Sequence, residues 1–225
     1  MAQIVAHDIK NPLTPIKLQA EHLRRVNAGQ GGPLSPVLET CVDTILDKVE
    51  ELRRLSVEFT SLGSSPTPRL EPVDLSRLLA DVVAPYRAAT PGQSPVQVVV
   101  EVAAPLPSAW LDATLFARAL TNVVENALHA MPSGGTLTVA ARAQEAARTI
   151  TIDVTDTGVG MDEQAVARIF EPYFSTKASG TGLGLTIARR NVESSGGRIS
   201  LRSVRGIGTT VTLTVPAVPG QTRQA

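Results

Sequence analysis

The apolar positions of the first sixty residues recur every three or four residues. One series runs over residues 2–23, and a second runs over residues 38–62. Such spacing places apolar side chains in one narrow stripe along a helix. A glycine-rich stretch at 27–33 separates the two series and is typical of a loop. The pattern therefore predicts a helical hairpin made of two amphipathic helices.

Two helices with so narrow a stripe bury little apolar surface by themselves. Two hairpins side by side would bury both stripes in a four-helix bundle. We therefore expect a homodimer through residues 1–62. Cys41 lies beside the second stripe, and we expect it to be a small buried hydrophobic side chain.

The pattern changes after residue 62. Residues 63–70 are rich in small residues and proline, which is typical of a linker between domains. Helical and strand-like segments alternate over 71–218, and residues 219–225 form a C-terminal tail. The alternation predicts an α/β two-layer sandwich, in which helices cover one side of an open mixed sheet.

Periodicity and capping residues locate the elements of this second domain. The predicted helices are a segment capped by Asp74 and the segments 112–131, 163–169 and 185–195; the predicted strands are 96–102, 137–141, 150–154, 199–204 and 210–215, the last two as a hairpin. Aromatic residues make up only 3% of the chain, so the core must come from Leu, Val, Ile and Ala.

The charge of the chain narrows the choice of partners. Lys and Arg together number 21, and so do Asp and Glu, so the chain has no basic excess that would favour nucleic acid or an anionic membrane surface. No apolar run reaches the ~20 residues that span a bilayer, so we expect this part of the protein to be soluble and cytoplasmic, without membrane contact. The first series begins only a few residues before His7, so we also expect a longer natural chain upstream, where a membrane tether stays open as an alternative.

A polar cluster lies beside the first stripe. His7, Asp8 and Asn11 fall within five residues, and His7 and Asn11 share a face if the segment is helical. Pro12 and Pro15 follow at once and remove two backbone donors, which favours a bend in the helix. A histidine on a helix is more often solvated than reactive, so this cluster alone assigns no function.

Two asparagines lie on the long predicted helix. Asn122 and Asn126 are four residues apart and share a face, with His129 near it. A carboxamide oxygen can bind Mg²⁺ while its N–H₂ group donates to phosphate, and a histidine can also donate to phosphate. A polar helix face is nevertheless more often only solvated.

Glycines mark two further candidate turns. Asp156, Gly158 and Gly160 come directly after a predicted strand, where glycine permits close approach of a flat ring and the carboxylate can accept from an exocyclic amine. A sequence of this form is also a common turn. The glycine-rich stretch 180–184 runs into a helix, whose backbone N–H groups could bind an anion.

An aromatic loop precedes the glycine-rich stretch. It covers residues 170–177 and ends in Lys177, which favours a mobile lid that brings a cation near phosphate. A lone Gly-x-Gly-x-Gly is weak evidence, and here it lacks the preceding strand of a dinucleotide-binding fingerprint.

The order of these motifs resembles a known family. The chain reads His-Asp-x-x-Asn-Pro-Leu, Asn-x-x-x-Asn, Asp-x-Gly-x-Gly, Phe-Glu-Pro-Tyr-Phe-Ser-Thr-Lys, Gly-Thr-Gly-Leu-Gly-Leu and, near the C-terminus, Gly-x-Gly-Thr-Thr. This series, over residues 7–216, resembles the motif order of sensor histidine kinases. The stretch 10–16, together with Glu58 and Phe59, is similar to the nitrogen-regulation, NtrY-like branch.

The resemblance implies a fold and roles for single residues. It implies an ATP-binding domain of the gyrase/kinase/MutL type, the Bergerat fold, joined to a dimerising phosphoacceptor hairpin. His7 resembles the phosphoacceptor, Asp8 the acid or base that orients the imidazole, and Asn11 the residue that orients water when a phosphorylated regulator is dephosphorylated. Asn126 resembles the Mg²⁺ ligand and Asp156 the carboxylate that reads adenine.

A larger set of positions resembles the family's ATP contacts. This set is Asn122, Asn126, His129, Asp156, Gly158, Gly160, Phe170, Phe174, Lys177, Gly180, Thr181, Gly182, Leu183, Gly184, Thr209 and Thr210. Either Thr209 or Thr210 is expected under the adenine edge. His129 departs from the family pattern, because many members have Lys or Arg there, and a neutral histidine would bind phosphate more weakly.

The resemblance implies an ATP-dependent histidine autokinase. It would use ATP and Mg²⁺ to phosphorylate His7 and pass the phosphoryl group to an aspartate on the receiver domain of a response regulator. In ATP-hydrolysing relatives, a glutamate four residues before the Mg²⁺ asparagine activates water. This chain has Asn122 at the position that resembles it, and a carboxamide cannot act as a base. We therefore expect poor ATP hydrolysis. Two alternatives stay open: an enzyme in which phosphatase activity dominates, and a degenerate dimeric scaffold that binds nucleotide.

Overall fold

The computed structural model describes part of each of two units. The described residues are 13, 16–21, 23–25, 38–49, 52, 67–87, 96–144, 146, 148–176 and 181–218. The chain consists of two compact units, residues 1–66 and 67–225. The polar residues His7, Asp8 and Asn11, the loop at 27–33 and the segment 177–180, which holds Lys177 and Gly180, lie outside the described residues. The domain boundaries expected at 62, 70 and 218 stay predictions.

The described residues of the first unit are helical along both apolar stripes, as predicted. An ion pair of 3.6 Å between Arg24 and Asp43 joins the two helical segments. The buried positions of the stripes are seven residues apart within each segment: Leu13 and Ala20, then Val42 and Val49. The exposed positions show the same interval: Ile16 and Leu23, then Leu38, Ile45 and Leu52. Each stripe therefore has a buried edge and an exposed edge.

The prediction that Cys41 is buried is wrong, because its side chain is exposed. At 100° per residue, Cys41 lies beyond the exposed positions Leu38 and Ile45, on the side away from Val42 and Val49. Adjacency to an apolar stripe in the sequence does not decide which edge of the stripe a residue joins.

Within the described residues of the second unit, five strands form one mixed sheet in the order β2-β4-β5-β7-β6. The strands are β2 (Val96–Val102), β4 (Gly135–Gln144), β5 (Thr149–Asp156), β6 (Arg198–Val204) and β7 (Gly208–Pro216). β2 and β4 are parallel, and the other neighbouring pairs are antiparallel. The predicted hairpin of the last two strands is confirmed. A separate ribbon of β1 (Glu71–Val73) and β3 (Ala109–Leu111) was not predicted, because three residues are too short to show alternation.

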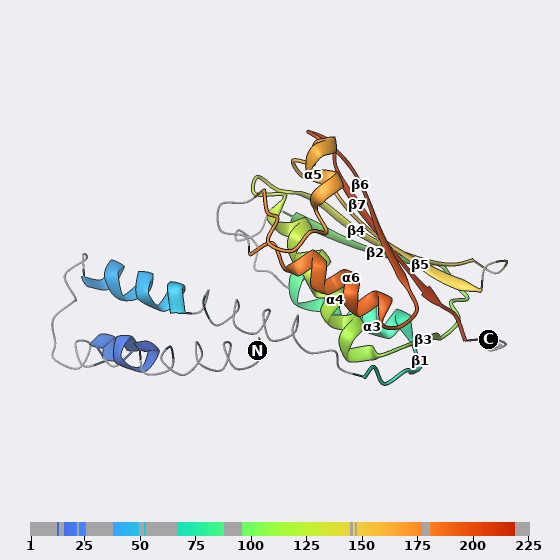
Figure 1. Ribbon diagram of the computed structural model, residues 1–225, viewed down its shortest axis with the longest axis horizontal. Helices are drawn as coiled ribbons and strands as arrows, with labels where there is room; N and C mark the ends of the chain where they lie inside the picture. The colour runs from blue at the N-terminus through green and yellow to red at the C-terminus, as the bar shows by residue number, and fades with distance from the viewer. Residues whose placement is uncertain are drawn as a thin grey trace. The chain divides into compact units, whose positions relative to one another are not determined.

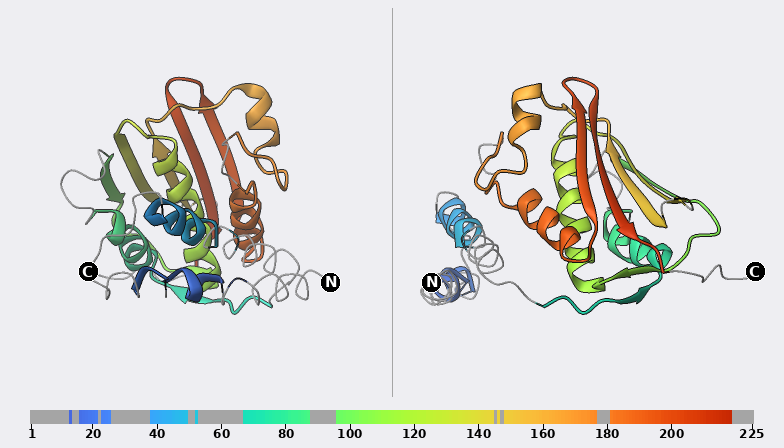
Figure 2. Two further views of the ribbon diagram at one scale, coloured as in Figure 1. Left: turned by 90° about the vertical axis from the view of Figure 1, so that its left-hand side faces the viewer. Right: turned by 45° about the vertical axis from the view of Figure 1, so that its right-hand side comes forward.

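The described helices α3, α4 and α6 lie against one face of this sheet, as Figures 1 and 2 show. They are α3 (Leu75–Arg87), α4 (Ala113–His129) and α6 (Gly184–Glu193), and the short α5 (Glu163–Arg168) precedes α6. The predicted cap of α3 is confirmed, since Asp74 accepts from the N–H of Arg77 at 3.2 Å. The prediction of an α/β two-layer domain is therefore confirmed.

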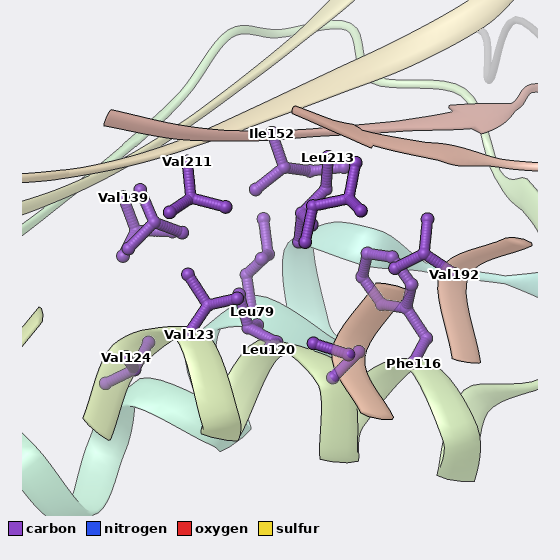
Figure 3. Packing of buried hydrophobic residues seen from close by; sticks show 14 of the residues in the cluster. Leu79, Phe116, Leu120, Val123, Val124, Val139, Ile152, Val192, Val211 and Leu213 are labelled. Atoms are coloured by element: carbon purple, nitrogen blue, oxygen red, sulfur yellow. The ribbon is translucent and has the colours of Figure 1, made fainter. Parts of the chain in front are cut away.

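The core forms between these helices and the sheet. Figure 3 shows Leu79, Phe116 and Leu120 of the helices turned toward Ile152 and Leu213 of the strands, and all five side chains are fully buried. The apolar face of α4 is thereby fixed against the sheet, which leaves its asparagines on another, partly exposed face. None of the helices in the described part of the chain is long and apolar enough to cross a membrane.

Candidate functional site

Helices α4 and α6 run antiparallel and bring two of the sequence motifs together. Nδ2 of Asn122 donates to the carbonyl of Gly184 at 3.1 Å, and Nδ2 of Asn191 donates to the carbonyl of Leu115 at 3.2 Å. The earlier residue of α4 is thus bonded to the later residue of α6, which is the order expected of antiparallel helices. The asparagine motif of α4 therefore meets the glycine-rich motif at the N-terminus of α6.

Asn126 lies one turn after Asn122 and faces the same helix end. A Cβ atom on Gly184 would lie 3.6 Å from Nδ2 of Asn126, so the carboxamide lies close to the first residue of α6. The first backbone N–H groups of a helix have no intrahelical acceptor, and they carry partial positive charge. Two carboxamides beside such a helix end form a polar site suited to an anion such as phosphate.

The bond from Asn122 to Gly184 also gives the carboxamide a positioning role. It needs a side-chain donor, which an ionised glutamate at this position could not supply. Asn122 therefore holds α6 against α4 in addition to facing the polar site.

Asp156 forms a second centre at the end of β5. Its side chain is buried, with only 5% of its surface exposed. Oδ1 accepts from the N–H of Gly158 at 2.8 Å and from the N–H of Thr209 on β7 at 3.3 Å. The carboxylate therefore links its own turn to the neighbouring strand.

The turn after Asp156 packs against the C-terminal end of α4. The N–H of Val159 donates to the carbonyl of Ala130 at 3.0 Å. A Cβ on Gly158 would lie 2.4 Å from that same carbonyl oxygen, so the close approach requires glycine. Ala130 lies eight residues after Asn122, about 12 Å along the helix. The two centres are therefore separated along one side of α4, as a base site and a phosphate site would be.

Strand alternation distinguishes Thr209 from Thr210. Thr209 is buried beside Asp156, and its hydroxyl lies 2.9 Å from Oγ of Ser203. Thr210 points to the opposite face of β7 and pairs with the hydroxyl of Thr155 at 3.1 Å. The geometry favours Thr209 as the residue near an adenine edge.

Hydrogen bonds hold the loop before α6 against the start of that helix. The N–H of Tyr173 donates to the carbonyl of Gly182 at 3.1 Å, and the hydroxyl of Thr186 donates to the carbonyl of Phe170 at 3.2 Å. The N–H of Leu183 donates to the hydroxyl of Thr181 at 3.3 Å. The first two bonds join the first half of the predicted lid to the start of α6, and the third stabilises the turn just before that helix.

The aromatic residues of the lid contact arginines that the sequence reasoning missed. The guanidinium of Arg168 lies 4.5 Å from the ring centroid of Phe174 and also pairs with Glu171 at 3.0 Å. Phe170 packs against the core, with the guanidinium of Arg189 at 5.8 Å. The three-residue spacing of Arg168 and Glu171 could have indicated their ion pair, but the stacking on Phe174 has no sequence pattern.

We expect Gly182→Ala to break the contact between Gly182 and Tyr173 that closes this loop. Gly182 has φ +69°, and a Cβ atom there would lie 2.5 Å from the carbonyl carbon of Tyr173. We expect a loss of about 1–3 kcal/mol in local stability and a several-fold weaker affinity for ATP, measured by hydrogen exchange and by calorimetric titration. Gly206→Ala is the control, because Gly206 has φ +78° with nothing within 4 Å of a Cβ atom. Equal effects of the two substitutions would show that backbone strain, not the contact with Tyr173, is responsible.

Asn126 lies between the two centres along α4, and His129 lies beside Ala130, at the Asp156 end of the helix. His129 is the last residue of α4, is exposed and lies three residues after Asn126. Among the described residues, no three His, Cys, Asp or Glu side chains gather as a metal site. Mg²⁺ is commonly held by one or two protein ligands together with water and substrate phosphates. An amide oxygen beside an anion site fits that manner of binding.

The comparisons with known proteins agree with this geometry. The model of the histidine kinase-, DNA gyrase B- and HSP90-like ATPases matches residues 111–219, and the model of the His Kinase A (phospho-acceptor) domain matches residues 1–64. The chain belongs to the histidine kinases. The predicted family is thereby confirmed, and the nucleotide-binding type of the second unit with it.

The similarity of this histidine kinase to individual proteins covers almost its whole length. It is 33% identical over 223 residues to the nitrogen regulation protein NtrY of Azorhizobium caulinodans. This match covers 96% of this chain and 28% of that protein. The structure of full-length ShkA in complex with AMPPNP matches 97% of this chain and 46% of that chain, at 25% identity and a TM-score of 0.78. The histidine kinase ThkA, in complex with the response regulator protein TrrA, has a similar fold, with a TM-score of 0.70, 22% identity, and coverage of 96% of this chain and 60% of that one. The chain thus spans about a quarter of the length of NtrY and about half of the matched ShkA chain.

Proposed function

We propose that this histidine kinase core uses ATP to phosphorylate His7 and then passes the phosphoryl group to an aspartate on the receiver domain of a response regulator. The observation that carries the proposal is Asn122, whose carboxamide is bonded to the start of α6. A hydrolase would need a general base, such as a glutamate, at this position to activate water. Without a base for water, the γ-phosphate is left for a protein nucleophile.

ATP would lie along α4. Its phosphates would meet the N-terminus of α6 beside Asn122 and Asn126, and its adenine would meet Asp156 and Thr209. Mg²⁺, held by the amide oxygen of Asn126 and by phosphate oxygens, would offset negative charge on the phosphates. Lys177 and His129 are the cationic or donor groups that we assign near the phosphates.

Phosphoryl transfer would occur at Nε2 of His7. The new P–N bond forms as the bond from the γ-phosphorus to the bridging oxygen breaks, and ADP leaves. Asp8 would hold the other ring nitrogen and stabilise the positive charge that develops on the imidazole. Assistance of this kind is worth roughly 10²- to 10⁴-fold in rate. The donated group then moves from the imidazole to the carboxylate of the regulator.

We also propose that the first unit forms a homodimer. Its exposed edge, at Ile16, Leu23, Leu38, Ile45 and Leu52, is apolar and repeats every seven residues. A second hairpin would bury these side chains as the other half of a four-helix bundle. A regulator would dock on this bundle near His7. The similarity to NtrY supports a place in the nitrogen-regulation branch.

The direct test incubates the wild-type chain with γ-labelled ATP. We expect label on the protein that survives alkali and is lost in acid, as a phosphoramidate is, and that moves to a receiver domain when one is added. A protein that released all label as inorganic phosphate would be a hydrolase, which contradicts the proposal. A protein that bound ATP and took no label would be the degenerate scaffold.

Phosphatase activity is the second candidate function, favoured by the position of Asn11 four residues after His7 in the sequence. We expect Asn11→Ala to slow dephosphorylation of a phosphorylated regulator by about tenfold or more, while labelling of His7 continues. The measurement is the loss of label from purified phosphorylated regulator, with Asn27→Ala as a control outside the cluster. An Asn11→Ala chain that dephosphorylates at the wild-type rate would remove this role.

A further inference from the structure

The chain enters the second unit along a short paired segment. β1 pairs antiparallel with β3. Two residues before β1, the backbone N–H of Arg69 donates to Oδ2 of Asp112, which follows β3, at 2.9 Å. This bond continues the strand pairing toward the linker. We name residues 69–73 together with residues 109–112 the linker ribbon.

Asp112 is the residue where the linker ribbon meets α4. Its second oxygen, Oδ1, accepts from the N–H groups of Thr114 and Leu115, both at 3.0 Å, and so caps the helix. Burial raises the pKa of Asp112, but the hydrogen bonds from Leu115, Arg69 and Thr114 and the charge of Arg69 outweigh burial and lower the pKa overall. The carboxylate is therefore ionised at neutral pH and accepts with both oxygens.

The same residue contacts the end of α6. The backbone N–H of Asp112 donates to the hydroxyl of Ser195 at 3.4 Å, and Ser195 is almost fully buried. One turn along, Asn191 of α6 donates to the carbonyl of Leu115. The first turn of α4 and the last turn of α6 therefore meet at the linker ribbon.

Both helices lead from this junction to the phosphate side of the candidate site. α4 has 17 residues, about 25 Å, and it holds Asn122 and Asn126. α6 begins at Gly184, which Asn122 contacts. The junction and the phosphate side are thus connected by two paired helices rather than by a loop, so the site keeps its own geometry and moves together with the junction.

We propose that Asp112 is a positioning residue for phosphoryl transfer, which fixes the point where the linker joins the nucleotide-binding unit. The inference rests on the proposed function, because it concerns delivery of the nucleotide to His7. We use hinge for the part of the linker about which the nucleotide-binding unit would turn to deliver the nucleotide. With Arg69 bonded to Asp112, the hinge ends before residue 69. Loss of the bond frees residues 69 and 70 first and lengthens the hinge by roughly 3.3 Å per residue. A longer connection lowers the effective concentration of the γ-phosphate at the histidine.

Asp112→Asn separates this role from helix capping. Asparagine caps helices as well as aspartate does, so one oxygen still accepts from Thr114 and Leu115, while its N–H₂ group cannot accept from Arg69. We expect the rate of autophosphorylation at saturating ATP to fall by about fivefold or more, with the KM for ATP unchanged. Asp112→Ala, which also loses the cap, should be slower and less stable, and Asp112→Asn should restore its stability.

Two changes at Arg69 test the other side of the same bond. Arg69→Pro removes the donating N–H and leaves Asp112 in place, so it should slow autophosphorylation as Asp112→Asn does. Arg69→Ala keeps the N–H and is the matched control, with a rate close to that of the wild type. The double variant Arg69→Pro with Asp112→Asn should be no slower than either single variant, because both remove one interaction.

Trp110 provides a readout that does not need activity. It is the single tryptophan of the chain, lies in β3 and is 42% exposed. Asp112→Asn should make its fluorescence easier to quench with acrylamide, and Arg69→Ala should not. Wild-type rates in Asp112→Asn, or a parallel loss of ATP affinity, would overturn the inference. A wild-type chain without label would contradict the proposed function and with it the positioning role of Asp112 in phosphoryl transfer. The quenching would still show whether Asp112 holds the linker ribbon.

Discussion

Replacing His7 with alanine is expected to reduce labelling from γ-labelled ATP to background. Alanine has no side-chain nitrogen that could accept the phosphoryl group, so the proposed acceptor is lost. The affinity for ATP should stay at the wild-type value, because the residues assigned to ATP binding, from Asn122 to Thr210, belong to the other unit. Labelling and calorimetric titration on the same preparation measure both quantities.

The other histidines supply the controls for this experiment. The sequence has three histidines, and His22→Ala and His129→Ala remove the other two one at a time. Both variants should still be labelled, with His129→Ala weaker in ATP affinity if His129 contacts phosphate. Label that persists in His7→Ala would place the acceptor elsewhere and contradict the assignment.

Asp156→Asn is expected to weaken ATP binding by roughly one to two orders of magnitude. Asparagine keeps an oxygen that can accept from Gly158 and Thr209, so the turn should remain folded. Its second group is N–H₂, which cannot accept from the exocyclic amine of adenine and opposes it with a second donor. Loss of a hydrogen bond to a charged group costs about 1.5–3 kcal/mol, which corresponds to this change in Kd.

A carboxylate on the same strand is the control for Asp156→Asn. Asp153 points to the opposite face of β5, where it pairs with Arg142, so Asp153→Asn removes the same charge away from the site. ATP affinity should be unchanged in that variant. Binding of GTP should fall less than binding of ATP in Asp156→Asn, because the new N–H₂ group can donate to the guanine carbonyl. Equal losses for both nucleotides would show that Asp156 supports the fold of the pocket and does not read the base.

Local patterns predicted most of the secondary structure. The seven-residue stripes, the cap at Asp74 and the long amphipathic helix α4 all depend on residues close in the chain. The same is true of the asparagines of α4, because a spacing of four puts them on one face. Interactions of short range can be read from periodicity, and for this reason these predictions are confirmed for the described residues.

Contacts between distant residues required the tertiary structure. The bond from Asn122 to Gly184 spans 62 residues, that from Thr209 to Asp156 spans 53, and that from Arg69 to Asp112 spans 43. The exposure of Cys41 likewise depends on which helix packs against which edge of its stripe. The sequence by itself determined most of the elements, the family and the residue types available for phosphoryl chemistry. Only packing of the helices on the sheet decided which of those residues meet, because a contact across the fold leaves no periodic pattern in the chain.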